Sequence, residues 1–462
     1  MALNLHPKQR EVILSDARFK VIRAGRRGGK TKLEVEDMAF DAVSCKDRPI
    51  FYIAPTQKQA RSIIWEMLKN RLAGVGEANE GRLEMKVPTE DGGYSMIYVA
   101  GWENRENFRG MNAYKIVFDE VDTMKDFFIG WQEIFRPSLI DLSGKATFIG
   151  TPKKENPNLR RLEKEGNDDL DYACFHFKTE DNPYIPKEEI EKAKEELDYE
   201  TYQQEFLAEY IDNQGALFSY TALLDTFSNT INKEDRKYLV VDIADDGSDK
   251  TIFSFWEGLE EYRREAFERL NTETIVRKIR EYASEDRIPY SNIVVDAIGV
   301  GAGVSSSSML DGIIGYKGSY SAIKTDQDIV RLPNAGYLKE APLISDYKNL
   351  RSQCIFTLAG LVNNHKISSK IEGRFKEYII EELSTYQDAS QGDGKRMAMQ
   401  KADVKEIIGR SPDHSDCWQM RMYFEVMAKI LPAQSEEASK VIRTQTNQFE
   451  INKTNFITSS NK

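Results

Sequence analysis

The sequence predicts two successive α/β domains, and three patterns indicate this. A short apolar strand near the N-terminus runs into a glycine-rich loop and then into a helix. Apolar strands and helical segments alternate after that loop, which is typical of a parallel sheet covered by helices. From about residue 236, three closely spaced strands, a helix and a further strand follow, with acidic residues at strand ends. The two halves therefore predict two sheets of different topology.

The composition limits the class of protein. Of 462 residues, 40% are hydrophobic and 30% are charged, which is typical of a soluble chain with two or three domains. No apolar run reaches the ~18 residues of a membrane span and no apolar signal core follows the N-terminus, so we expect a cytoplasmic protein. A net charge of −11 argues against a uniformly basic nucleic-acid-coating protein, but not against a local basic channel. The four cysteines form no C-x-x-C pair, so neither a zinc knuckle nor a disulfide framework is indicated.

Residues 19–31, FKVIRAGRRGGKT, have the layout of a phosphate-binding loop. A glycine-rich turn at a helix start aims backbone N–H groups and the positive end of the helix dipole at one point. We expect the backbone of Gly28 and Gly29 to cradle ATP phosphates there. Lys30 would reach the terminal phosphates, and the Thr31 hydroxyl would hold Mg²⁺.

The loop departs from the usual motif at one position. The pattern G-x-x-x-x-G-K-[ST] begins with a glycine, and Ala24 stands at that place. A basic, glycine-rich surface loop is therefore the alternative interpretation. Gln9, shortly before the loop, has the paired donor and acceptor that can read an adenine edge, although an exposed polar residue fits its spacing equally.

Residues at the ends of two later strands complete an expected ATP site. The strand at 115–118 delivers Asp119, which would bind Mg²⁺ through water, and Glu120, which would polarise the attacking water. The strand at 146–149 leads to Thr151, whose hydroxyl could sense the γ-phosphate; a plain strand-ending turn is the alternative.

Arginine is expected near the same phosphate, because phosphoryl transfer develops negative charge in the transition state. Arg23 and Arg26 in the loop and Arg109 in an F-R-G triplet are the candidates. Whether the arginine acts in cis or in trans stays open.

The second half has three separated acids where a ribonuclease H-like fold requires them. Strands at 238–241, 251–256 and 262–267 precede a helix at 272–283 and a strand at 292–295, so Asp242 and Asp296 should lie side by side. A helix that starts near Pro412 should deliver a third carboxylate, Asp416, with Asp413 as the alternative. Converging carboxylates favour Mg²⁺ or Mn²⁺, and two such ions can support phosphodiester cleavage.

Two residues beside these acids have open roles. Lys401 could contact a scissile phosphate, although a lysine on a helix is usually solvated. His414 is better explained as a residue of the helix start than as a metal ligand, because no partner histidine lies at metal spacing.

The chain divides into four predicted segments. We expect a P-loop NTPase domain of the RecA-like (ASCE) type at 1–180, a lid or linker subdomain at 181–235, the ribonuclease H-like domain at 236–430, and a polar, disordered tail at 431–462. The stretch 156–235 has a charge-rich and mostly helical pattern, with an exposed helix at 187–197.

The motifs RAGRRGGKT, IAPT, FRG, IVFDEVD and FIGTPK, in this order, resemble the ATPase half of the large terminase subunit of tailed double-stranded DNA bacteriophages. The resemblance extends over residues 1–430. Carried over position by position, it implies a set of ATP-site residues: Lys30, Thr31, Asp119, Glu120, Thr151 for coupling, Gln9 on adenine and Arg109 as a possible trans finger. It likewise implies a set of nuclease residues: Asp242, Asp296 and Asp416, with Asp249 as a supporting metal ligand.

The resemblance implies an ATP-driven motor that moves double-stranded DNA into a procapsid and cuts concatemeric DNA by two-metal hydrolysis. The expected cofactors are ATP with Mg²⁺ in the first half and Mg²⁺ or Mn²⁺ in the second. The expected partners are DNA, the portal ring and a small terminase subunit, in the cytoplasm of an infected bacterium. The family also implies a monomer in solution and a pentamer at the portal.

Three other functions share some of these features. A repair helicase-nuclease should carry a second motor domain with its own arginine motif, and none is visible between residues 122 and 237. A transposase would have the three acids but no need of Lys30 and Glu120. A portal adaptor with a switch-only ATP site could dispense with Glu120.

Overall fold

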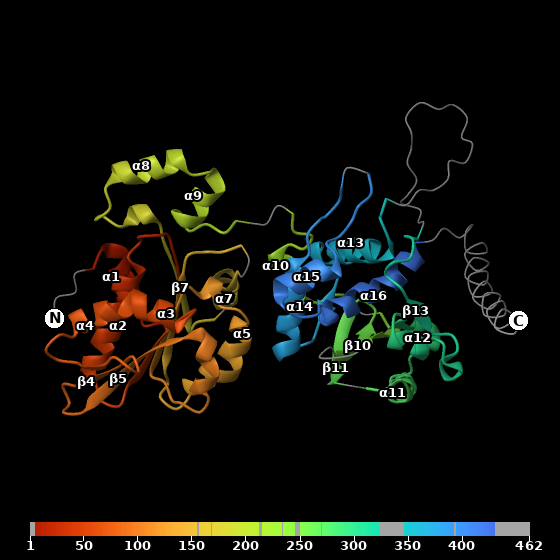
Figure 1. The fold of residues 1–462 in the computed structure, drawn as a ribbon, viewed down its shortest axis with the longest axis horizontal. Coiled ribbons are helices and arrows are strands. Elements are labelled where there is room, and N and C mark those ends of the chain that lie inside the picture. Colours follow the sequence, from red (N-terminus) through yellow and green to blue (C-terminus); the bar gives the residue numbers. More distant parts are fainter. Residues whose placement is uncertain are drawn as a thin grey trace, which may run out of the picture. The chain divides into compact units, whose positions relative to one another are not determined.

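The computed structural model describes residues 5–154, 157–167, 169–211, 215–232, 234–244, 250–268, 270–323, 346–391 and 394–429. The chain forms two compact units, residues 1–214 and 215–462 (Figure 1). Their boundary falls inside the predicted lid or linker at 181–235, so that segment is divided between the units. The predicted tail at 431–462 lies outside the described residues.

The first unit is built on an eight-stranded sheet in the order β3-β4-β5-β2-β6-β7-β1-β8. The six strands from β5 to β8 in this order are parallel, and β3 and β4 extend the edge in antiparallel fashion. The strand bounds are β1 Phe19–Ala24, β2 Pro49–Ala54, β3 Glu77–Asn79, β4 Glu84–Pro88, β5 Tyr94–Gly101, β6 Lys115–Asp119, β7 Lys145–Gly150 and β8 Tyr172–Phe177.

The strand order brings the predicted ATP-site motifs to one edge of this sheet. β7 lies between β1, which leads into the glycine-rich loop, and β6, which ends at Asp119. Because these strands are parallel, their carboxyl ends meet at the same edge. The arrangement confirms the predicted P-loop NTPase fold of this unit.

Helices cover both faces of the parallel sheet. Their bounds are α1 Pro7–Leu14, α2 Lys30–Ser44, α3 Gln57–Ala60, α4 Glu66–Arg71, α5 Phe127–Gly130, α6 Arg136–Ser138, α7 Asn158–Gly166, α8 Lys187–Glu196 and α9 Tyr199–Glu205. The helix predicted at 57–72 exists as α3 and α4, joined by a π-helical segment at Arg61–Trp65. The exposed helix predicted at 187–197 is confirmed as α8, whose buried residue is Ile190.

The prediction of a mostly helical stretch at 156–235 is wrong for β8. This strand pairs in parallel with β1 along its whole length and completes the sheet. Its sequence, YACFHF, is too short and too mixed to stand out between charged neighbours, and only pairing with β1 stabilises it as a strand. β8 also brings the chain back beside the phosphate loop.

The second unit is built on a six-stranded sheet in the order β13-β12-β9-β10-β11-β14. The strands β9, β10 and β11 are antiparallel, and β12 lies parallel to β9 on its other side. The bounds are β9 Lys237–Asp242, β10 Lys250–Glu257, β11 Glu260–Glu268, β12 Ile293–Asp296, β13 Ile314–Tyr316 and β14 Ser368–Ser369. This topology confirms the predicted ribonuclease H-like fold.

Alternate residues of β9 belong to two hydrophobic cores. Leu239 and Val241 pack in a cluster with α11 (Thr272–Glu285). Tyr238 and Val240 pack in a larger cluster with α13, α14 and α16. The sheet therefore separates two apolar layers, as the two-residue period of a strand requires.

The remaining helices of this unit are α10 Tyr220–Asp225, α12 Val300–Ser305, α13 Leu350–Asn363, α14 Gly373–Thr385, α15 Lys401–Ile408 and α16 Asp413–Ala428. Leu223 and Leu224 of α10 are buried in the larger cluster. This burial explains why residues 215–235 fold with the second unit and not with a lid. Among the described ranges, no helix is both long and apolar enough to cross a membrane.

Candidate functional sites

The glycine-rich loop begins immediately after a buried strand. Ala24 is the last residue of β1 and is fully buried, so the position of the missing motif glycine belongs to the sheet edge. The loop ends at Gly29, whose φ of 92° lies in the left-handed region that favours glycine. A Cβ atom there would lie 2.6 Å from the side-chain nitrogen of Gln9. α2 then starts at Lys30, with Thr31 next in its first turn.

Lys30 connects three strand ends. Its Nζ donates to Thr151 Oγ1 at 2.7 Å and lies 3.1 Å from Glu120 Oε1. Thr151 Oγ1 in turn donates to the carbonyl oxygen of Ala24 at 2.9 Å. The ends of β1, β6 and β7 thus meet around one ammonium group, as a polyphosphate site requires.

Asp119 is suited to hold a cation near this lysine. It is 2% exposed, and Tyr52 Oη donates to its Oδ2 at 2.5 Å. Its Oδ1 is buried without a hydrogen-bond partner in the described part of the chain. Burial, followed by the charge of Glu120, raises the pKa of Asp119 to about 6. A buried carboxylate with an unsatisfied oxygen fits the predicted contact with Mg²⁺ through water.

Glu34 is an acidic residue of this site that the sequence interpretation missed. It lies on α2 one turn after Lys30 and is 2% exposed, and both of its carboxyl oxygens are buried without a described hydrogen-bond partner. Burial and then the charge of Asp119 raise the pKa of Glu34 well above its ordinary value. Its i, i+4 spacing from Lys30 is the signal that could have indicated it.

Gln9 lies against the loop instead of facing an open pocket. It is 1% exposed, its Nε2 donates to the carbonyl oxygen of Gly29 at 2.7 Å, and its Oε1 accepts from His6 N at 3.0 Å. The His6 ring contacts the carbonyl oxygen of Gly28 at 3.0 Å. In this structure the two side chains support the backbone of the phosphate loop.

The two loop arginines point to different partners. Arg23 pairs with Glu163 at 3.2 Å and with Glu209 at 3.1 Å. Arg26 forms an ion pair with Glu205 of α9, and its backbone N donates to the carbonyl oxygen of the same residue at 2.7 Å. The Arg26 side chain nevertheless remains 66% exposed.

Glu205 connects the loop to the segment that follows β7. Lys153 Nζ lies 2.6 Å from its Oε1, while Arg26 binds its Oε2. Burial raises the pKa of Glu205, but the hydrogen bonds from Arg26 and Lys153 outweigh it and lower the pKa to about 2. Sequence spacing carries no signal for this contact, because Glu205 and the loop are 179 positions apart in the chain.

Arg109 lies on the surface of the first unit. Its guanidinium pairs with Glu106 at 2.6 Å and Glu133 at 3.2 Å, and its side chain is 48% exposed. This exposure is compatible with a partner outside the chain.

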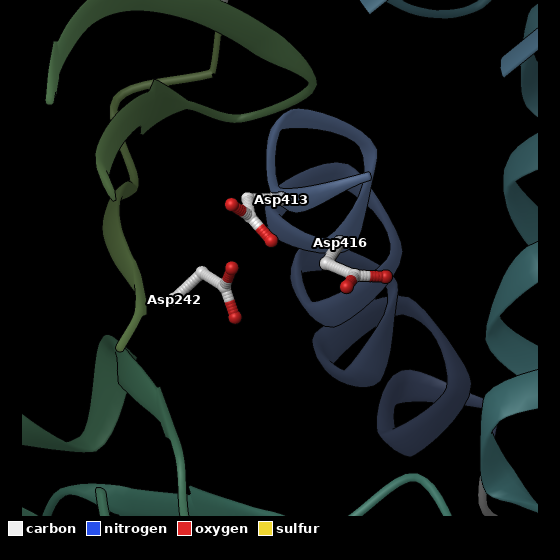
Figure 2. A group of neighbouring side chains, drawn as sticks. All are labelled: Asp242, Asp413 and Asp416. Atoms are coloured by element: carbon white, nitrogen blue, oxygen red, sulfur yellow. The ribbon is translucent and has the colours of Figure 1, made fainter. Parts of the chain in front are cut away.

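Three aspartates come together in the second unit. One carboxylate oxygen each from Asp242, Asp413 and Asp416 lies within 4.8 Å of the others, and Figure 2 shows the three side chains converging from β9 and α16. Burial raises the pKa of Asp242 well above its usual range, although the charge of Lys401 opposes this. Hard oxygen donors at this spacing fit Mg²⁺ or Mn²⁺.

The structure brings together both of the residues that sequence analysis held as alternatives. Asp413 and Asp416 lie in the first turn of α16, so each can contribute an oxygen. Asp296 ends β12 next to Asp242 on β9 and lines the same cavity, but it is not in the three-oxygen group. Asp249 lies outside the described residues.

A lysine lies among these acids. Lys401 Nζ lies 2.6 Å from Asp416 Oδ2 and 3.7 Å from Asp413 Oδ1. Burial lowers the pKa of Lys401, but the charges of Asp416 and Asp242 outweigh burial and raise it. The surrounding cavity has a volume of about 660 Å³ and is also lined by the basic residues Lys348 and Arg351.

Comparisons with known proteins identify the family of the first unit. Residues 21–225 match the family model for the T4likevirus-type terminase large subunit, N-terminal region. The large terminase subunit of Escherichia phage T5 is 24% identical over 243 residues, which cover 52% of this chain and 53% of that protein. The chain therefore aligns with about half the length of this curated relative.

Two solved structures show a weaker likeness. The large terminase of a thermophilic bacteriophage is 15% identical with a TM-score of 0.42, covering 88% of this chain and 97% of that one. The nuclease domain of the large terminase subunit of bacterial virus Sf6 is 21% identical with a TM-score of 0.37, covering 45% and 98%. Because both TM-scores lie below 0.5, the family assignment rests on the match of residues 21–225, which confirms the predicted resemblance.

Proposed function

Because residues 21–225 carry the N-terminal domain of the terminase large-subunit family, we propose that this chain is an ATP-driven motor that packages double-stranded viral DNA into a procapsid. Its second unit cleaves concatemeric DNA by metal-dependent phosphodiester hydrolysis. The observation that carries the motor assignment is the contact of Lys30 Nζ with both Thr151 and Glu120. A phosphate-binding lysine, a carboxylate that can orient water and a hydroxyl on the neighbouring strand are groups that ATP hydrolysis requires.

In the motor unit, the loop amides and Lys30 bind the phosphates of ATP. Mg²⁺, held by Thr31 and through water by Asp119, would neutralise phosphate charge when bound. Glu120 pairs with Lys30 in this structure, so a polyphosphate competes with Glu120 for that ammonium. Once released, Glu120 can orient the attacking water.

Arg26 is the loop arginine that we assign to the γ-phosphate. Arg23 is 15% exposed and bound by two carboxylates and the carbonyl oxygen of Ala208, whereas Arg26 is largely exposed. Arg109 fits the role of an arginine that acts on a neighbouring subunit, because it lies on the surface. Thr151 would report hydrolysis to the segment that follows it.

In the nuclease unit, Asp242, Asp413 and Asp416 would hold Mg²⁺ or Mn²⁺ beside Asp296, and two such ions would activate water and stabilise the leaving 3′ oxygen. Lys401 reaches the same carboxylates and is about half exposed, so it can also contact the backbone of bound DNA. The basic side chains on the cavity wall suit the same phosphates.

We further propose the partners of the motor. They are double-stranded DNA, the portal ring and a small terminase subunit, in the cytoplasm of the infected bacterium. The chain would be a monomer in solution and a pentamer on the portal. The family match does not favour a transposase, a repair nuclease or a switch-only adaptor.

Reciprocal variants of the two units test the proposal. We expect Glu120→Gln to abolish DNA-stimulated ATP hydrolysis and to leave plasmid cleavage in Mn²⁺ intact, because Glu120 belongs to the first site alone. Asp242→Asn should do the reverse, and Asp296→Asn should also impair cleavage. ATP hydrolysis that survives Glu120→Gln contradicts the motor assignment. Cleavage that is unchanged in both aspartate variants contradicts the nuclease assignment.

A further inference from the structure

The start of α16 determines where two of the metal-binding carboxylates lie. Asp413 and Asp416 are three residues apart in its first turn, so at about 100° per residue they share one face of the helix. His414 and Ser415, between them, face other directions. Buried groups from two other elements hold these intervening residues.

On one side, α14 binds the helix start. Glu382 of α14 is fully buried, and its Oε2 accepts a hydrogen bond from the backbone N of Ser415 at 2.6 Å. Its Oε1 pairs with Arg410, which also binds Glu381 at 2.5 Å. A carboxylate that accepts from an N-terminal N–H group caps the helix, so α14 fixes the position of the first turn.

On the other side, β11 binds the same turn through Arg264. The Arg264 Nη1 contacts His414 Nδ1 and the carbonyl oxygen of His414, each at 3.0 Å. Because arginine can only donate, His414 Nδ1 accepts and its ring proton lies on Nε2. Phe375 and Tyr378 flank the imidazole at ring distances of 5.3 and 5.0 Å.

Arg264 is itself held rigidly. Its Nε donates to Glu261 Oε1 at 2.8 Å, and the opposite carboxyl oxygen of Glu261 accepts from Trp418 Nε1 at 2.7 Å. Ser254 donates to Glu261 as well, at 2.5 Å. Arg264 and Glu261 are buried and have opposite charges, so the pair can position the helix without adding net charge beneath the acids.

From these contacts, and resting on the proposed nuclease function, we propose that Arg264 and Glu382 are positioning residues that set the divalent-cation affinity of the site. Each acts through a residue between Asp413 and Asp416. A shift of α16 would move both carboxylates relative to Asp242 on β9. Groups that orient metal ligands typically change metal affinity about 10–100-fold when they are altered.

Arg264→Lys and Glu382→Gln test the proposal in the full-length chain. A lysine cannot donate in the forked geometry that reaches both His414 Nδ1 and its carbonyl oxygen. A glutamine keeps the shape of Glu382 but turns an uncharged amide toward Arg410. Arg421→Lys is the matched control, because Arg421 is also fully buried and donates to the carbonyl oxygen of Gly258, but lies further along α16.

Mn²⁺ binding followed by electron paramagnetic resonance of the free ion, plasmid cleavage against Mn²⁺ concentration, and thermal melting are the readouts. We expect Arg264→Lys and Glu382→Gln to raise the Mn²⁺ dissociation constant about tenfold, with cleavage largely restored at saturating Mn²⁺. Arg421→Lys should leave the constant unchanged. Equal melting losses in all three variants with an unchanged Mn²⁺ constant would overturn the proposal, because the ion pairs would then stabilise the fold alone. Absence of Mn²⁺ binding by the unaltered chain would instead refute the nuclease function.

Discussion

The two candidate sites have opposite charge arrangements. In the first unit, Lys30 lies among Glu120 and the hydroxyl of Thr151, where an anionic phosphate would bind. In the second, Asp416 and its neighbouring acids surround Lys401, where a cation would bind. Both sites contain a lysine–carboxylate pair. Only in the first does the lysine have the charge that attracts the ligand.

This difference assigns different roles to the two lysines. ATP would compete with Glu120 for Lys30, so the lysine stays in the loaded site. Divalent cations would compete with Lys401 for Asp416, so the lysine must give way. The comparison predicts that removing Lys30 weakens ligand binding and that removing Lys401 strengthens metal binding.

The largest expected effect is on the first site. Lys30→Ala should lower ATP hydrolysis by about 10²- to 10³-fold, because a charged group at the transferring phosphate is lost. Plasmid cleavage in Mn²⁺ should stay at the level of the unaltered chain. An equal loss of both activities would mean that the two sites are not separate.

Gln9→Ala distinguishes support of the loop from recognition of adenine. Loss of the Gln9 contact leaves the carbonyl oxygen of Gly29 without its side-chain donor, and we expect a roughly tenfold rise in KM. If Gln9 supports the loop, KM should rise equally for ATP and GTP. A rise confined to ATP would restore the adenine role predicted from sequence. Gln59→Ala, at an exposed glutamine of the same unit, is the control.

Lys401→Ala tests the inverted charge of the second site. Without the ammonium, the acidic side chains lie close together with no basic partner among them, and Mn²⁺ should stabilise the variant by several degrees more than the unaltered chain. Melting with and without Mn²⁺ measures this difference. An equal shift in both proteins would show that Lys401 does not compete with the cation.

The smallest expected effect concerns Glu205, which joins the loop to the segment after β7. Its pKa is lowered to about 2, so its ion pairs stabilise the fold above the ordinary value of 4.5, and this stability is lost as the pH falls from there toward 2. The melting temperature of Glu205→Gln should be lower by about 2 °C at pH 6, since solvent screens the exposed Arg26. The difference should narrow at about pH 3.5, where the unfolded chain is protonated. A constant difference would show that the charge of Glu205 is irrelevant.

Local sequence patterns predicted much of the first site. The loop, Lys30, Asp119 and Thr151 each follow a strand end, and parallel strands bring such ends together whatever the details of packing. Glu34 was missed although it lies one turn after Lys30, because a charged residue in a helix usually faces solvent. Only its burial shows that it contacts the site.

The second site depended more on the tertiary structure. The strand pattern predicted that Asp242 and Asp296 would be neighbours, but the choice between Asp413 and Asp416 depends on how α16 is rotated. α14 and β11 determine that rotation through Glu382 and Arg264, which are far from the helix in sequence. No local pattern could have shown that both aspartates belong to the group.

The sequence by itself therefore determined the two fold classes, the phosphate loop and the acids at strand ends, because these depend on residue period and on neighbours in the chain. The tertiary structure decided the position of β8, the burial of Gln9, the pairing of Arg26 with Glu205 and the place of Lys401 among the acids. Each of these contacts joins elements that are distant in sequence. Their formation depends on which strands pair and which helix faces pack, and neighbouring residues alone do not encode that choice.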